Sequence, residues 1–388
     1  MKDERKAPKL RFKGFTDDWE QCKLKNKAEI VRGASPRPIS NPKWFDDNSN
    51  VGWLRISDVT EQKGRIHHLS QRISKAGQSK TRVITEPHLL LSIAATVGSP
   101  VINYVNTGVH DGFLIFLNPT FDKEFMFQWL LMFKPYWNKY GQPGSQVNLN
   151  SDIVGNQSVA FPTTSEQERI GSFFRKLDRT ITLHEEKKRQ LERLKSALMQ
   201  KMFADKSGYP PVRFEGFSNE WEHCKLGDVA DITTGSRNHQ DSVTDGKYPF
   251  FVRSDKVERL NEYDFDTKAI LVPGDGRIGE IFHYYNGKFA LHQRVYKVDN
   301  FNGINELFLL GLFKYSFKEH ALRLNAQGTV PSLRLPMFTN WSISVPMITE
   351  QERIGVFFQK LERTISLYDH KLELLKKVKR SMLQAMFI

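Results

Sequence analysis

Three short stretches of the sequence contain residue types that could transfer methyl groups, bind a dinucleotide or cut DNA. Asn118-Pro-Thr-Phe121 approaches the Asn-Pro-Pro-Phe motif of methyltransferases that act on base amino groups, but it lacks the second proline and is interpreted as a turn. Gly274-Asp-Gly276-Arg-Ile-Gly279 fits G-x-G-x-x-G, yet a strand-like segment follows it, whereas the dinucleotide-binding motif opens a helix. Glu185-Glu-Lys187 resembles part of a nuclease site, but its place in a long helical pattern favours a solvent-exposed face. The sequence therefore predicts no catalytic site of its own.

A second set of residues suits contact with DNA. The chain has 57 Lys and Arg against 44 Asp and Glu, a formal net charge of +13, and such residues release counterions when they approach phosphates. Arg with guanine, and Asn or Gln with adenine, are the productive contacts to base edges. For each single residue, a solvent-exposed position or a contact with a phosphate remains the alternative to a contact with a base. In residues 25–161 the candidates are Arg32, Arg37, Lys43, Arg55, Lys80, Arg82 and Ser145, and in residues 227–345 they are Arg237, Asn238, His239, Arg253, Arg277, His292, Gln293, Arg294, Thr329 and Arg334.

The two cysteines, Cys22 and Cys224, are interpreted as one small buried position that occurs twice in the chain. Two thiols in 388 residues indicate a reducing compartment and no disulfide framework. The first residues, Met-Lys-Asp-Glu-Arg-Lys, are charged where a signal peptide is apolar. The sequence contains no run of about 18 apolar residues, which a membrane span would need. It also contains no H-E-x-x-H or paired Cys-x-x-Cys sequence that would indicate a metal site. We therefore expect a cytoplasmic protein without a metal.

Internal repeats dominate the organisation of the chain. Residues 8–24 and 210–226 share ten of seventeen positions, among them Arg11 and Arg213, and the tryptophans Trp19 and Trp221. Residues 162–203 align without a gap on residues 346–387, and half of the positions are identical. Residues 25–161 and 227–345 match each other poorly. Two halves with a shared frame and different contents are what a protein with two different binding domains requires.

The longer repeat predicts two helices. Apolar residues recur at alternating steps of four and three, which is a heptad pattern, and each helix should run about 35 residues, or roughly 50 Å. Ser165 and Thr349 are expected to cap them, each with a glutamate three residues later. The seam of the first helix is Ile170, Phe174, Leu177, Ile181, His184, Lys188, Leu191, Lys195, Leu198 and Met202. The seam of the second is Ile354, Phe358, Leu361, Ile365, Tyr368, Leu372, Leu375, Met382 and Met386, with Lys379 at the position equivalent to Lys195.

An apolar stripe this long favours pairing of the two helices, although two independent surface helices are the alternative. The first helix is followed by a short turn and the second variable region, so the second helix must run back along the first. We therefore expect an antiparallel pair, related by a pseudo-twofold axis. By the same repeat, the segment near Pro8 should lie against the end of the second helix near Phe387, just as Pro210 follows the first helix.

The variable regions contain short strand-like runs between turns rich in Gly, Pro and Asn. Residues 52–56, 88–93 and 112–117 are such runs in the first region, and residues 125–133 and 305–317 are expected helices. The fold class is therefore α+β, with two globular domains joined by two long antiparallel coiled-coil helices. The expected boundaries are 1–161 for the first domain, 162–205 for the central helix, 206–345 for the second domain and 346–388 for the C-terminal helix.

The repeated motifs resemble the specificity subunit of type I restriction-modification systems, the HsdS family. Glu-Gln-x-x-Ile, Phe-Phe, Arg-Thr-Ile and Met-Phe recur in order along both helices, and Arg-Phe-x-Gly-Phe with Trp-Glu begins each half. The resemblance covers the whole chain. It implies that each variable region is a target-recognition domain for one half of a bipartite, asymmetric site in double-stranded DNA.

The same resemblance implies the partners. Two methyltransferase subunits, which bind S-adenosylmethionine, would dock along the helices, and restriction subunits would join that core, whereas this chain would be non-catalytic and hold no cofactor. The helices would fix the distance between half-sites, which lie about 34 Å apart when they are one DNA turn apart. Two alternatives are a methyltransferase or nuclease with its own active site, and a purely structural coiled-coil protein.

Overall fold

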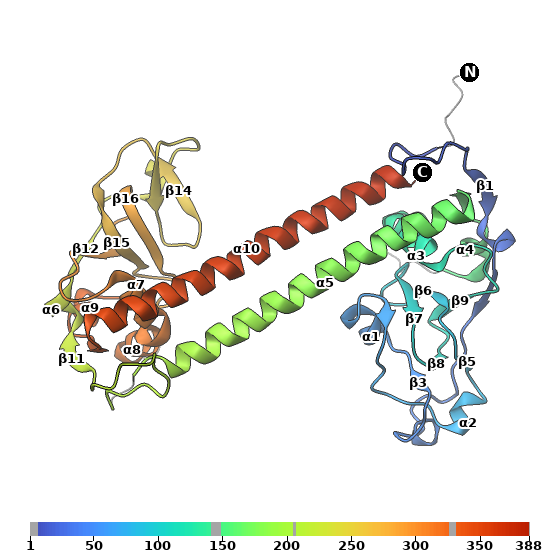
Figure 1. The fold of residues 1–388 in the computed structure, drawn as a ribbon, viewed down its shortest axis with the longest axis horizontal. Coiled ribbons are helices and arrows are strands. Elements are labelled where there is room, and N and C mark those ends of the chain that lie inside the picture. The colour runs from blue at the N-terminus through green and yellow to red at the C-terminus, as the bar shows by residue number, and fades with distance from the viewer. Residues whose placement is uncertain (1–6, 141–148, 205–206, 326–330, 388) are drawn as a thin grey trace. The chain divides into compact units, whose positions relative to one another are not determined.

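The structure, a computed structural model, describes residues 7–140, 149–204, 207–325 and 331–387. The chain divides into two compact units: the first contains Met1–His184 and Lys371–Ile388, and the second contains Glu185–His370. Two long helices, α5 (Thr164–Lys201) and α10 (Ile348–Met386), are drawn in green and red in Figure 1. Each unit therefore combines one globular domain with the start of one long helix and the end of the other.

The globular part of the first unit is built on a five-stranded sheet of order β2-β9-β6-β7-β4 and a three-stranded sheet of order β3-β8-β5. Its strands are β1 (Glu20–Lys23), β2 (Glu29–Arg32), β3 (Gly52–Trp53), β4 (Arg65–Ile66), β5 (Arg82–Ile84), β6 (Leu89–Ser92), β7 (Pro100–Asn103), β8 (Thr107–Val109), β9 (Phe113–Leu117) and β10 (Ser158–Phe161). Its shorter helices are α1 (Ile56–Glu61), α2 (Lys75–Gln78), α3 (Lys123–Phe133) and α4 (Ser151–Gly155). Strands β1 and β10 pair with each other apart from these sheets.

The central strands of this sheet are apolar because both faces are covered. Leu89 and Leu91 of β6 pack in the core that includes α3, whereas Leu90 packs in a separate core on the other face. Successive side chains of a strand point to opposite faces, so an uninterrupted apolar run predicts a strand that is buried on both sides.

The second unit contains a six-stranded sheet of order β12-β17-β15-β16-β13-β14 and the separate pair β11-β18. Its strands are β11 (Glu222–Lys225), β12 (Asp231–Thr234), β13 (Tyr248–Phe251), β14 (Val257–Leu260), β15 (Phe265–Pro273), β16 (His283–Leu291), β17 (Val295–Asp299) and β18 (Ser342–Val345). Its shorter helices are α6 (Leu226–Val229), α7 (Glu306–Leu312), α8 (Lys318–Leu324) and α9 (Leu335–Thr339). The predicted helix over 305–317 is interrupted, because residues 313–317 form a wide π-helical turn between α7 and α8.

The long helices pair antiparallel within each unit. In the second unit, Lys188 Nζ lies 2.5 Å from Asp369 Oδ1 and Lys195 Nζ lies 2.6 Å from Glu362 Oε1, so α10 runs backwards as α5 runs forwards. In the first unit, Lys379 Nζ lies 2.5 Å from Asp178 Oδ1. Asp178 and Glu362 occupy equivalent places in the repeat, as do Lys379 and Lys195. The predicted α+β fold with two long antiparallel helices is thus confirmed.

The N-terminal segment lies where the repeat predicted. The Leu10 amide donates to the Ala385 carbonyl at 2.9 Å near the end of α10, and the Val212 amide donates to the Lys201 carbonyl at 2.9 Å at the end of α5. Phe387 packs against Trp19 in the first unit, with ring centroids 6.5 Å apart. The first globular domain is therefore bound to the end of α10, and the second is bound in the same way to the end of α5.

The predicted caps of the long helices are wrong. Ser165 and Thr349 lie inside α5 and α10, which begin at Thr164 and Ile348. The Gln167 side chain donates to the Pro162 carbonyl at 2.9 Å, and Gln351 donates to the Pro346 carbonyl at 2.8 Å. These amides close the first turn from inside the fold, so the helices begin before the expected caps.

Candidate nucleic-acid interface

In the second unit, the loop after β12 lies against the loop between β16 and β17. Arg237 and His292 form an isolated parallel bridge, and the Gln293 amide donates to the Arg237 carbonyl at 2.9 Å. The Gln293 Nε2 atom donates to Asn238 Oδ1 at 2.6 Å. Four of the predicted DNA-contacting residues, Arg237, Asn238, His292 and Gln293, are therefore brought together by backbone and side-chain hydrogen bonds. We call these two loops the second-unit loop cluster.

The neighbouring loops contribute further predicted residues. Leu333 donates its amide to the Gly274 carbonyl at 2.6 Å, and Gly274 donates to the Arg294 carbonyl at 2.7 Å, so Arg294 and Arg334 adjoin the loop over 274–280. Arg253 Nη1 lies 3.1 Å from Asp275 Oδ2 of that loop. His239 Nε2 lies 3.0 Å from Glu258 Oε1 on β14.

Most of the arginines in this region are paired with carboxylates. Arg237 contacts Glu262 and Asp264, both at 2.9 Å. Arg277 contacts Asp255 at 3.0 Å and Glu280 at 3.1 Å. A ligand must therefore compete with, or make use of, an existing ion pair at these residues.

His292 is buried. Burial, followed by the positive charge of Arg253, lowers the pKa of its imidazole. Its Nδ1 atom accepts the Arg294 amide at 2.9 Å. In the first unit, His110 repeats the arrangement: its Nδ1 accepts the Gly112 amide at 2.9 Å, and burial lowers its pKa. Two otherwise unlike domains thus share one histidine-centred loop, which the sequence comparison missed although both histidines begin a turn just before a strand.

In the first unit, Asp111 organises a smaller basic group that we call the first-unit loop cluster. Arg37 Nη2 donates to Asp111 Oδ2 at 2.6 Å, and Arg32 Nε donates to the Asp111 carbonyl at 2.6 Å. Arg82 Nε donates to the Arg32 carbonyl at 2.7 Å. The Ser35 hydroxyl, and with it the Arg37 charge, lowers the pKa of Asp111. Asp111 was not predicted from the sequence.

Other predicted residues lie elsewhere or outside the described part of the chain. Lys80 precedes Thr81, whose hydroxyl donates to the Ala34 carbonyl at 2.5 Å, next to the first-unit loop cluster. Arg55 instead contacts Asp58 at 3.0 Å and the Ser70 hydroxyl at 2.7 Å. Lys43 lies over the Trp44 ring, 4.3 Å from its centroid, beside a polar hollow that Lys75 also lines. Ser145 and Thr329 lie outside the described residues.

The residues predicted to pair the long helices are all buried or half-buried. The buried ones are Ile170, Phe174, Ile181, Ile354, Phe358, Leu361 and Leu372, and the half-buried ones are Leu177, Leu191, Leu198, Ile365, Leu375 and Met382.

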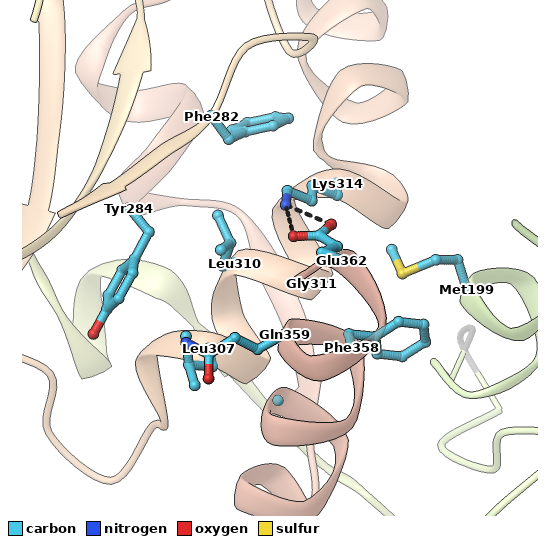
Figure 2. A pocket seen from close by; sticks show the side chains of 11 residues that line it. Met199, Phe282, Tyr284, Leu307, Leu310, Gly311, Lys314, Phe358, Gln359 and Glu362 are labelled. Carbon is cyan, nitrogen blue, oxygen red and sulfur yellow. Dashed lines mark hydrogen bonds and ion pairs between the residues drawn. The ribbon is translucent and has the colours of Figure 1, made fainter. Parts of the chain in front are cut away.

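A cavity of about 270 Å³ lies in the second unit between α7, α10 and the start of β16. Figure 2 shows its mostly apolar lining, which includes Phe282, Leu307 and Phe358, with the Lys314 ammonium on the Glu362 carboxylate at one side. Although burial opposes the charged form, the ammonium groups of Lys314 and Lys195 lower the pKa of Glu362. The Glu362 carboxylate is already paired with the Lys314 and Lys195 ammonium groups. The charged groups that line this cavity are therefore engaged with one another.

Neither a membrane-spanning helix nor a cluster of metal-ligating side chains is found among the described residues. Within the described ranges, no helix is both long and apolar enough to cross a bilayer. Among the same residues, no three His, Cys, Asp or Glu side chains gather as a metal site would require.

Comparison with known proteins gives a consistent family. A family model described as "Type I restriction modification DNA specificity domain" matches residues 16–193 and 218–377. The specificity subunit of the Escherichia coli type I restriction enzyme EcoDI is 28% identical over 169 residues, which are 42% of this chain and 37% of that protein. The Methanocaldococcus jannaschii MjaIX specificity subunit is 20% identical over 424 residues, with 94% of this chain and 92% of that protein covered.

The relatives differ in how much of their length aligns with this chain. The alignments with EcoDI and with the M. jannaschii MjaVIII specificity subunit span about two fifths of each relative's length. The crystal structure of a type I restriction-modification S subunit from M. genitalium superposes with a TM-score of 0.69 at 13% identity, over 98% of this chain and 99% of that one. At this identity the likeness concerns the fold.

Proposed function

This chain belongs to the type I restriction-modification DNA specificity family, and we propose that it is the non-catalytic, DNA-reading subunit of a restriction-modification complex. In this proposal, residues 1–161 and 206–345 are target-recognition domains, and residues 162–205 and 346–388 are the helices between them. Each domain reads one half of a bipartite, asymmetric site in double-stranded DNA. The observation that carries the proposal is the presence of two unlike basic loop clusters on one repeated frame.

The repeated frame supports two reading domains held in equivalent ways. Arg11 forms a two-pronged contact with Glu166 at 2.8 and 2.7 Å in the first unit. Arg213 forms the same contact with Glu350 at 2.9 and 2.6 Å in the second. Paired guanidinium–carboxylate contacts of this geometry fix orientation as well as distance. Each domain is thereby fixed to the start of its own long helix by the same device, while its loops are free to differ.

Exposed apolar residues on the long helices support a scaffolding role. Leu183 and Leu194 on α5 are exposed, as are Leu367 and Val378 at the equivalent places on α10. Apolar side chains exposed at equivalent places of two otherwise charged helices are a surface that contact with another protein would cover. In this proposal, these two equivalent sets of side chains contact two methyltransferase subunits, which carry S-adenosylmethionine, and restriction subunits join that core in the cytoplasm.

The proposal is tested by mapping methylation in cells that contain this chain and its methyltransferase subunit, with a cell that contains the methyltransferase subunit alone as control. We expect a split motif with two specific halves around a fixed spacer, and no motif in the control. A single continuous motif, or methylation by the methyltransferase subunit without this chain, would contradict the proposal. Methyl transfer by this chain alone would support the enzyme alternative.

A further inference from the structure

The guanidinium of Arg237 is bound by two carboxylates in very different surroundings. Its Nε atom donates to Asp264 Oδ1 at 2.9 Å, and its Nη2 atom donates to Glu262 Oε2 at 2.9 Å. The Asp264 side chain is 14% exposed, whereas that of Glu262 is 71% exposed. One carboxylate is therefore part of the fold, and the other is a surface group.

Asp264 is fixed in place immediately before β15. Its amide donates to the Phe289 carbonyl at 2.9 Å, and its Oδ2 atom accepts the Leu291 amide at 3.1 Å. Its other oxygen accepts from Arg237, so both oxygens are occupied. Asp264 can therefore orient Arg237 through one oxygen while the backbone of β16 holds the other.

The backbone of Arg237 is fixed as well. Its amide donates to the Leu291 carbonyl at 3.2 Å, and its carbonyl accepts from the Gln293 amide at 2.9 Å. The backbone and the Nε edge of Arg237 are thus both held by residues around the end of β16. A guanidinium has five N–H donors, so the edge formed by Nη1 and Nη2 becomes available once Glu262 moves away.

We propose that Asp264 is a positioning residue that directs Arg237 at a guanine in the second half-site, while Glu262 is a displaceable competitor of DNA for the same guanidinium. This inference rests on the proposed function. A guanidinium held in advance loses less conformational freedom when it binds, and its two terminal nitrogens match guanine O6 and N7. An exposed carboxylate beside that edge repels the phosphates of any DNA, so it weakens binding to all sequences alike.

Arg277 provides a contrast within the same domain. Its partners Asp255 and Glu280 are both exposed, and the Arg277 side chain itself is 60% exposed. Asp255 and Glu280 both lie outside the strands of the sheet. Arg277 is therefore expected to contact phosphates, with little effect on which base is preferred.

The test uses the complex of this chain with its methyltransferase subunit, in the wild type and in Asp264→Asn, Glu262→Gln and Arg237→Gln variants. Methylation mapping gives the base preference at every position of the motif, and binding is measured on a matched DNA duplex and on single-base-pair variants. We expect Asp264→Asn to reduce the preference for guanine at one position of one half-site by roughly five- to a hundred-fold. Arg237→Gln should relax the same position, and a variant that combines Arg237→Gln with Asp264→Asn should relax it no further.

Glu262→Gln is the matched control, because it alters the same guanidinium from the exposed side. It should raise affinity for all DNA by roughly two- to threefold, at unchanged base preference. Thermal melting shows whether the domain remains folded, and Arg237→Gln tests the same contact without altering Asp264. Three outcomes would overturn the inference. The motif could be unchanged in Asp264→Asn, the base preference could fall equally at all positions of the half-site, or Glu262→Gln could lose the guanine preference. Lack of a split motif in the wild type would instead overturn the proposed function.

Discussion

Substitution of Arg213 by methionine should destabilise the second unit more than substitution of Arg11 destabilises the first. Glu166 and Glu350 each have only 1% of the side chain exposed. Loss of one partner of a buried ion pair leaves an uncompensated charge, which costs roughly 3–5 kcal/mol. The two units differ in what remains, because Trp19 Nε1 also donates to Glu166 at 3.2 Å, whereas Trp221 Nε1 has no hydrogen-bond partner among the described residues.

The difference between the two variants follows from that single hydrogen bond. A hydrogen bond to a charged group contributes roughly 1.5–3 kcal/mol, so Arg11→Met should cost about 1–3 kcal/mol and Arg213→Met the full 3–5 kcal/mol. In a unit of this size each kcal/mol shifts the melting temperature by about 2–4 °C. The Arg213→Met unit should therefore melt roughly 6–20 °C lower.

Tryptophan fluorescence during thermal and urea unfolding measures both effects, since Trp19 and Trp221 are each buried in the core of their own unit. Arg353→Met is the matched control. Arg353 is an exposed residue of the same helix turn and lies over the Phe217 ring, 5.3 Å from its centroid, so its loss should cost about 0.5 kcal/mol or less. Equal costs for Arg11→Met and Arg213→Met, or a cost of Arg213→Met no larger than that of the control, would refute the reasoning.

Three further predictions concern connectivity, assembly and pH. In a circular permutant, residue 387 is joined to residue 7 by a short linker, and the chain begins at residue 207 and ends at residue 204. It should fold and bind DNA like the parent, because the Leu10–Ala385 and Val212–Lys201 hydrogen bonds are equivalent contacts. A soluble permutant that does not bind DNA would contradict this. Leu183→Glu combined with Leu367→Glu should reduce capture of the methyltransferase subunit in a pull-down at least tenfold, with DNA binding by the lone chain unchanged, whereas Lys187→Glu with Lys371→Glu controls for charge. Burial lowers the pKa of His292, so the unfolded chain binds more protons than the folded one as the pH falls below about 6.5, and the second unit should lose stability there. His292→Gln should reduce this dependence of stability on pH in urea melts between pH 5 and 8. An unchanged dependence would exclude His292 as its source.

The repeat predicted much of the frame, since identical residues at identical spacing must meet equivalent neighbours. It predicted the two long helices and the contact between the N-terminal segment and the end of α10, while the connection between the helices predicted that they run antiparallel. The burial of Glu166 and Glu350 was missed, although Arg11 and Arg213, and both glutamates, are identical in the two copies. The caps were predicted wrongly for a similar reason. The expected caps rested on a local sequence pattern, whereas the buried Gln167 and Gln351 side chains bond the backbone at the start of each helix.

The loop clusters were predicted in part. The basic residues lie at the turns where strand-like runs end, so turn composition indicated them. Their carboxylate partners could not be predicted, because Asp111 and Asp264 lie 74 and 27 residues from the arginines that they bind, and sheet topology decides that proximity. The predicted strand over residues 52–56 is shorter than expected, since β3 has only two residues and α1 begins at Ile56.

Whether two separate domains read two separate half-sites is decided by exchanging residues 25–161 for those of another family member and mapping the methylated motif of the resulting complex. One half of the motif should change, while the other half and the spacer should stay as they were. A motif in which both halves change together, or in which neither half changes, would contradict it.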